Sequence, residues 1–160
     1  MATILSAVAG ADPRLEKSRQ EAIERVNRVN EFLLTVLKNH LVAEQFIDEF
    51  LIASGKRAKG SFADKAQHCQ NLKPPEVDPP VWKMLSHANQ LRNKIAHTLD
   101  EAEIKLKMDE LRAAYLATLS PEQQKAAENL DDAKIAAGAF ELFGAYLVAA
   151  TKTAGAGGKP

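Results

Sequence analysis

Cysteine is almost absent from this chain, since Cys69 is the only one among 160 residues. It has no partner for an internal disulfide bond, which is typical of a reducing compartment, and we expect a cytoplasmic protein. Aromatic residues are also scarce, at 6%, while alanine is abundant, and both features favour helices over strands. No apolar run approaches about 18 residues, so the sequence predicts no membrane span.

An excess of either charge is also lacking, because 21 Lys and Arg residues are balanced by 21 Asp and Glu residues. This balance argues against a broad surface that coats nucleic acid, but not against a small basic site. The chain has no G-x-S-x-G elbow, no P-loop and no glycine-rich dinucleotide turn. It also lacks paired cysteines and a second histidine at zinc-ligand spacing, so we expect neither a metal nor a cofactor.

Apolar residues recur at helical spacing along most of the chain, and no segment reads as a strand or a repeat. A chain of this length suits one domain. We therefore predict an all-α protein, an up-and-down bundle of about five to six helices, with one domain over 16–150. The ends, 1–15 and 151–160, are expected to be loose.

Local signals mark where these helices begin and end. Ser54-Gly55 ends a helix, Ser61 with Asp64 and Ser120 with Gln123 have the form of N-terminal caps, and Asp78 precedes a proline-led helix start. The expected helices are 16–38, 41–53, one from Ser61, 81–97, one around 104–115, one from Ser120, and 132–150. Asn39 and His40 mark a short break or lie within one long first helix.

The first expected helix carries apolar side chains over about half of its circumference, more than one buried face needs. Such a helix is either central in a bundle or buried by a second subunit. The two neighbouring stripes consist of Ile23, Val26, Asn30, Leu33, Leu34 and Leu37, and of Val29, Phe32 and Val36.

The segment Leu91–His97 holds the residue types best suited to chemistry on a phosphodiester. Arg92 keeps its charge at every physiological pH and can hold phosphate, while His97 can move a proton near neutrality. On a helix, Asn93 and His97 share an outward face, whereas Arg92 lies at the margin of the apolar stripe. A cation at that margin needs a partner, which Glu44 could provide.

Asp48 is an equally suitable partner for Arg92, which would then form a structural ion pair between helices. His40 and Glu44, one turn apart, could line the same cleft as the motif. His97 could also be no more than a histidine favourably placed at a helix C-terminus.

The run Leu-Arg-Asn-Lys-Ile-Ala-His resembles the signature of HEPN domains, and the likeness extends to Asn39–Phe46, Ser61–Lys65 and Trp82. The resemblance implies a helical bundle that forms a two-fold dimer, and a metal-independent endoribonuclease of a toxin, antiphage or RNA-processing system. It implies that His97 is the general acid and base, that Arg92 stabilises the phosphate charge and that Asn93 orients it. Partners would be RNA, a second copy and an antitoxin or defence protein.

Other members of that family have lost catalysis and bind RNA or proteins, and this alternative stays open. Members that pair with a nucleotidyltransferase carry a tyrosine two residues after the histidine, where this chain has Leu99. Trp82 and Cys69 are expected in the core, and His68 and His87 at the surface. The basic loop Lys56–Lys59 is either a solvated turn or an RNA contact.

Overall fold

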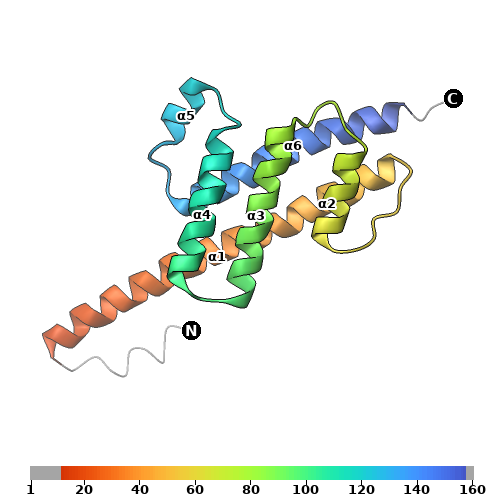
Figure 1. Cartoon of the computed structure of the whole chain (residues 1–160). Helices are drawn as coiled ribbons and strands as arrows, with labels where there is room; N and C mark the ends of the chain where they lie inside the picture. Colours follow the sequence, from red (N-terminus) through yellow and green to blue (C-terminus); the bar gives the residue numbers. More distant parts are fainter. Residues whose placement is uncertain (1–11, 158–160) are drawn as a thin grey trace.

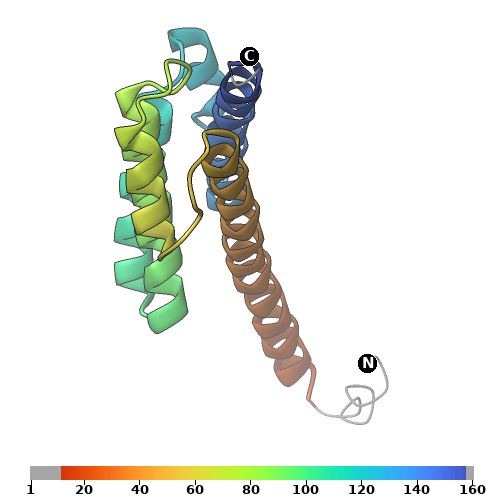
Figure 2. The ribbon, with the colours of Figure 1, turned by 90° about the vertical axis from the view of Figure 1, so that its right-hand side faces the viewer.

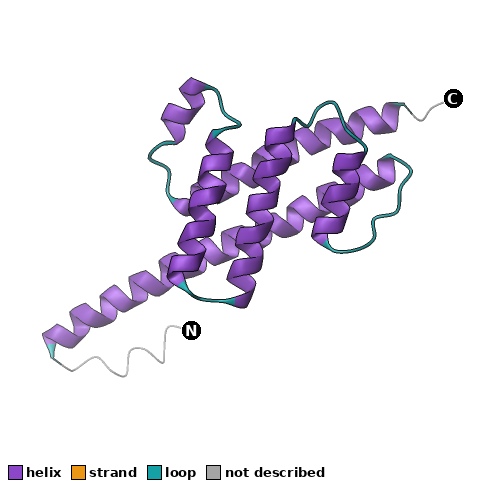
Figure 3. Cartoon of the chain, viewed as in Figure 1, coloured by secondary structure: helices purple, strands orange, loops and turns teal. Residues whose placement is uncertain are grey.

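The computed structural model describes residues 12–157, and every regular element in this range is an α-helix (Figure 3). The predicted all-α class is confirmed, with six helices in these residues. Residues 1–11 and 158–160 lie outside the described range, and with them most of the ends expected to be loose. The helices are α1 (Pro13–Ala53), α2 (Phe62–Asn71), α3 (Pro79–His97), α4 (Glu101–Leu116), α5 (Pro121–Ala127) and α6 (Asp132–Ala156) (Figure 1).

The helices form two layers, as Figure 2 shows from the side. α1 and α6 lie side by side in one layer, and α2, α3 and α4 cross them in the other. The three crossing helices alternate in direction, whereas α1 and α6 run the same way (Figure 1). Phe46 meets Gly144 near the middle of this pair, and Ala53 and Thr153 line one hollow near its C-terminal end.

α1 is a single helix of 41 residues, so Asn39 and His40 lie within it and mark no break. Neither glycine nor proline occurs between its first residue and its C-cap, and nothing in the sequence therefore interrupts the helical hydrogen bonds. Asp12 caps its N-terminus by accepting a hydrogen bond from the backbone N–H of Arg14. Gly55 follows its C-cap with a φ of 72°, which glycine adopts without strain.

The predicted N-terminal caps of α2 and α5 are confirmed as reciprocal capping boxes. α3 begins at Pro79, two residues before the expected start, and Asp78 makes no side-chain capping bond there. α6 continues six residues beyond the predicted end at Ala150; this segment has no proline, and its one glycine, Gly155, lies in the last turn.

The core fills the space between the two layers. Trp82 is buried and meets the ring of Phe143 edge-on, with centroids 5.7 Å apart, so its prediction as a core anchor is confirmed. Cys69 is fully buried, as expected, and burial raises the pKa of its thiol to about 12. The largest fully buried side chains are Phe143, Ile47, Leu51, Met84, Leu91, Met108, Leu111, Ile135 and Leu147.

α6 is, contrary to expectation, long and apolar enough by length and composition to cross a membrane. Its place in the fold accounts for this composition, because α6 packs on α1, α3 and α4. One face carries large buried side chains such as Phe143 and Leu147, while the exposed face carries Glu141 and the small residues Ala145 and Ala149. A core helix with neighbours on several sides needs this apolar content.

The wide apolar surface of α1 is covered over only part of its length. The C-terminal half lies under α2 and beside α6, whereas the N-terminal part extends beyond the other helices (Figure 1). Val26 and Leu34 are more than half exposed, at 55% and 52%, even though Phe32, Leu33 and Val36 near them pack in the core, so uncovered apolar residues occur on the outer face of the packed part as well. α1 is thus central in the bundle on one face, while apolar residues on its outer face have no cover within residues 12–157.

Candidate functional site

The C-terminal half of α3 holds the predicted catalytic residues, and their faces are as expected. Asn93 and His97 are exposed, while Arg92 is half-buried at the edge of the core formed by Leu91 and Ile95. α3 ends at His97, and the backbone N–H of its C-cap, Thr98, donates to the carbonyl of Lys94. The motif therefore lies at the end of a regular helix.

The predicted ion pair between Arg92 and Glu44 or Asp48 is wrong. Both carboxylates contact Lys65 of α2 instead, since Lys65 Nζ lies 2.9 Å from Glu44 Oε1 and 2.9 Å from Asp48 Oδ1. α2 packs directly on this part of α1, which brings Lys65 nearer to the two acids than α3 brings Arg92. Sequence reasoning missed Lys65, although its place three residues after buried Phe62 put it on the core side of α2.

The contacts of Lys65 fix its charge. It is 9% exposed, and the hydrogen bond to Glu44, followed by that to Asp48, raises the pKa of its ammonium group against the opposing effect of burial. An ammonium group with two carboxylates in a partly buried site is satisfied as an ion. The cluster joins α1 to α2 without involving α3.

Arg92 makes a different contact, because its Nη1 donates to the side-chain oxygen of Asn93 at 3.1 Å. Over residues 12–157, no carboxylate lies within 4.0 Å of its guanidinium group. The charge of Arg92 is thus held next to Asn93 and is available to an external anion.

His40 is 3% exposed and lies in the interior, not on a cleft wall. Its Nε2 donates to Asn89 Oδ1 at 3.0 Å, and its ring stacks on Phe62 with centroids 4.1 Å apart. Burial, aided by the charge of Arg92, lowers the pKa of His40, while Asn89 and Glu44 oppose the change. A neutral His40 therefore links α1, α2 and α3 beneath the motif, so it does not share an open cleft with Glu44 as proposed from the sequence.

The other side of α3 is occupied by α4. Lys94 Nζ lies 3.0 Å from Glu103 Oε2, and Lys107 of α4 donates to Gln90 at 3.2 Å. His87, predicted at the surface, is half-buried, with its Nδ1 3.6 Å from Glu110. His68 is half-buried as well. These contacts fix α3 against α4 and leave Asn93 and His97 out of the interface.

Trp82, Ser86, Asn89, Asn93 and His97 lie along one stripe of α3, because they are spaced four, three, four and four residues apart. The N-terminal part of this stripe faces α2 across two hollows. One, of ≈ 170 Å³, is lined by Ser86 and Asn89, and the other, of ≈ 630 Å³, extends to the loop before α3. Three residues line both hollows, Gln67, Gln70 and Trp82, so the two lie next to each other along the groove between α2 and α3.

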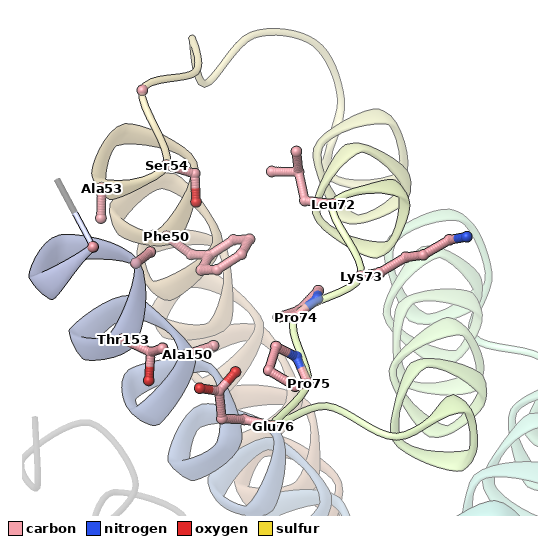
Figure 4. A pocket seen from close by; sticks show the side chains of 13 residues that line it. Phe50, Ala53, Ser54, Leu72, Lys73, Pro74, Pro75, Glu76, Ala150 and Thr153 are labelled. Atoms are coloured by element: carbon pink, nitrogen blue, oxygen red, sulfur yellow. The ribbon is translucent and has the colours of Figure 1, made fainter.

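A separate pocket of ≈ 580 Å³ lies where α1 and α6 end (Figure 4). Phe50, Leu72 and Ala150 contribute to its walls, and the loop through Lys73 and Pro74 closes one side. Lys73 has a φ of 49°, a left-handed conformation that is uncommon outside glycine. No motif residue lines this pocket.

Within residues 12–157, no group of three or more histidine, cysteine, aspartate or glutamate side chains could hold a metal ion. The candidate site consists of one half-buried cation and exposed amide and imidazole groups. Such groups can bind a phosphate and exchange protons with it, but they supply no redox chemistry.

Comparisons with known proteins identify no relative. No family model matches the chain, and neither the curated proteins nor the solved structures contain a significant match.

Proposed function

We propose that this protein is a metal-independent endoribonuclease of the HEPN type, with Arg92, Asn93 and His97 at its centre. One observation carries the proposal. Arg92 has no carboxylate within 4.0 Å in the described chain, although it lies at the core margin, and it contacts Asn93 on the face that also presents His97. A structural arginine at such a margin would be expected to have an anionic partner.

In the proposed reaction, the imidazole of His97 takes the proton of a ribose 2′-hydroxyl as its oxygen attacks the adjacent phosphorus. The bond from phosphorus to the 5′-oxygen breaks, and that oxygen takes up a proton, leaving a 2′,3′-cyclic phosphate and a 5′-hydroxyl. Arg92 stabilises the negative charge that develops on the non-bridging oxygens. Asn93 donates from its amide nitrogen to the same phosphate while its oxygen orients Arg92.

The proposal includes a two-fold dimer. Arg92 and His97 are five residues apart, which places them about 140° apart around α3. A second copy would supply the missing half of each site. The exposed apolar residues of α1, among them Val26 and Leu34, support such an association because apolar surface favours burial. An antitoxin or defence protein that restrains the activity remains part of the same hypothesis.

Cleavage of a labelled single-stranded RNA in EDTA tests the proposal. The wild-type chain should produce 2′,3′-cyclic phosphate ends, and His97→Ala should lower the rate by at least about 100-fold, the usual contribution of a general acid or base. Arg92→Lys should also lose most activity, since a lysine keeps the charge but not the planar fork. Lys94→Ala, one turn before the helix end but paired with α4, is the matched control and should keep activity. Equal cleavage by His97→Ala and wild type would refute the role of His97.

The second candidate is a non-catalytic helical module that binds RNA or a protein through the same surface. The ion pair of Arg92 on which this alternative relied is not formed, but the exposed apolar part of α1 still favours an interaction role. The reaction products distinguish the two candidate functions, because only the nuclease yields cyclic phosphate ends. RNA binding without any cleavage, in both wild type and His97→Ala, would favour the module.

A further inference from the structure

We propose that the groove between α2 and α3 holds the unpaired bases of the RNA strand next to the phosphate bound by the motif, and that Gln67 and Gln70 read those bases. This inference rests on the proposed function for the position of the RNA strand relative to the motif. The groove and its chemistry are independent of catalysis. It assigns the protein a substrate class, single-stranded RNA with unstacked bases.

The motif and the groove lie on the same stripe of α3. Asn89 lines the smaller hollow, and Asn93 and His97 follow it on the same stripe of α3 at successive helical turns. From Trp82 to His97 the stripe is about 22 Å long at 1.5 Å per residue. α2 covers its first half and leaves its second half open, so one strand could contact both.

The walls of the groove offer hydrogen-bond donors and acceptors. Amide side chains dominate the polar lining, and an amide can match the donors and acceptors on a base edge, as asparagine and glutamine do with adenine. Gln67 Nε2 donates to Asn71 Oδ1 at 3.0 Å, which fixes the two amides relative to each other and leaves each with unused hydrogen-bonding capacity. The amide residues that line the two hollows are Gln67, Gln70, Asn71 and Asn89.

The charge of the residues that line the groove also suits a nucleic acid. No aspartate or glutamate lines either hollow, although these residues make up half of the charged residues of the chain. The one charged residue in the lining is Lys73, at the end of the groove far from His97. A polyanion is therefore not repelled along the groove and meets a cation at each end, Arg92 and Lys73.

The groove suits a single strand better than a duplex. In an A-form duplex the base edges are paired and the major groove is too narrow for side chains to enter. The larger hollow, of ≈ 630 Å³, has the size of a small-molecule pocket and suits a base turned out of a single strand. Unpaired segments are also the usual targets of sequence-specific RNA recognition.

Trp82 makes the inference directly testable. It is the only tryptophan in the chain and lines both hollows, so its fluorescence reports on their occupancy. Short oligouridylate, oligoadenylate and oligocytidylate are titrated into the full-length His97→Ala chain in EDTA, with binding followed by anisotropy of a labelled RNA and by Trp82 emission. We expect emission to change in step with binding for single strands and to stay constant with a duplex.

Gln70→Ala should weaken binding of the preferred homopolymer by about tenfold, the loss of one good base contact, and Gln70→Glu should weaken it further by repulsion. Gln45→Ala, an exposed glutamine on α1 that lines neither hollow, should bind as the parent does. Thermal unfolding of each variant verifies that the fold is retained. If Gln70 served stability alone, Gln70→Glu would not be expected to bind RNA more weakly than Gln70→Ala.

The outcomes separate the two proposals. In one outcome the wild-type chain cuts RNA, but Trp82 emission does not change when RNA binds, and the Gln70 variants keep their affinity and base preference. The groove proposal is then wrong and the nuclease proposal stands. If no cleavage occurs but emission and affinity respond as expected, the groove is an RNA-binding site and the nuclease proposal fails. Binding confined to duplex RNA would also overturn the groove proposal.

Discussion

At the scale of single residues, the interior polar contacts decide which groups remain available for chemistry. Lys65 engages Glu44 and Asp48, and His40 bonds to Asn89, so the carboxylates near the motif are already partnered. Arg92 is left with a neutral partner, Asn93. The proposed phosphate site thus depends on a lysine and a histidine that would not touch the substrate.

The lowered pKa of His40 predicts a pH-dependent stability. In the unfolded chain His40 would take up a proton as the pH falls below about 6.5, whereas burial next to Arg92 resists this in the folded chain. The unfolded state then binds more protons, so the free energy of unfolding should fall through this window until the lower folded pKa is passed. Urea unfolding at about pH 7.5 and about pH 5 measures the difference.

His40→Gln, which retains an amide donor for Asn89 but does not titrate, should lose part of this pH dependence. The same measurement on His68→Gln, at a half-buried histidine of α2, shows how much of the effect is specific to His40. Identical slopes for wild type and His40→Gln would show that His40 does not carry the effect.

Part of this polar arrangement was predictable from the sequence. The place of Arg92 at the core margin and of Asn93 on the outward face follows from helical spacing alone, and the structure has Arg92 half-buried and Asn93 exposed. The partner of Glu44 was not predictable, because it depends on how α2 lies on α1. Spacing within one helix determines which face a residue occupies, but the choice between two cations on different helices needs their packing.

At the scale of helices, the close approach of α1 and α6 depends on one glycine. A Cβ added to Gly144 would lie 2.7 Å from Cε2 of Phe46, closer than carbon atoms pack, so either the Phe46 ring or the helix would have to shift. Gly138 has a similar relation to Tyr115 of α4, whose hydroxyl would lie 2.7 Å from a new Cβ. α6 is thus fitted to its neighbours at positions without a side chain.

Gly144→Ala should therefore destabilise the protein by about 1–3 kcal/mol, the usual cost of overpacking, even though alanine is the better helix former. Gly155→Ala, in the same helix with nothing within 4 Å of the new Cβ, should be neutral or gain up to about 1 kcal/mol. Chemical denaturation of the two variants measures the contrast. Equal stabilities would mean that Phe46 moves aside freely.

The individual helices were largely predictable, because their stripes, caps and stops are local signals. Ser61 and Ser120 begin helices as expected, and Gly55 ends α1. The common direction of α1 and α6 and their shared layer were not predictable. They follow from side-chain contacts between segments about a hundred residues apart, which no local pattern encodes.

At the scale of the whole molecule, the two layers leave α1 uncovered at its N-terminal end. Arg25 pairs with Glu101 at the start of α4, which ties the last covered turns to the crossing layer. C-terminal to this ion pair, Val26 and Leu34 still remain more than half exposed, although Leu33 next to them packs against the core. The proposed dimer would bury this part.

Leu34→Glu should weaken self-association by about tenfold or more, equivalent to about 1.4 kcal/mol, because it places a charge in the buried surface. Ile52→Glu changes another exposed apolar residue, 67% exposed, near the C-terminal end of α1 and should leave association unchanged. Sedimentation velocity over a range of concentrations compares them. A wild-type chain that stays monomeric throughout would refute the dimer and the shared site.

The pairing of α1 with α6 also sets an order of assembly. α2, α3 and α4 contact neighbours close in sequence, and such contacts form early and fast. The surface of α1 that receives α6 stays open until α6 has been synthesised, so a nascent chain exposes Ala43 and Phe46, which face Gly144 of α6 in the finished fold, to solvent until then. Completion of the fold, and with it burial of these side chains, therefore waits for the C-terminal helix.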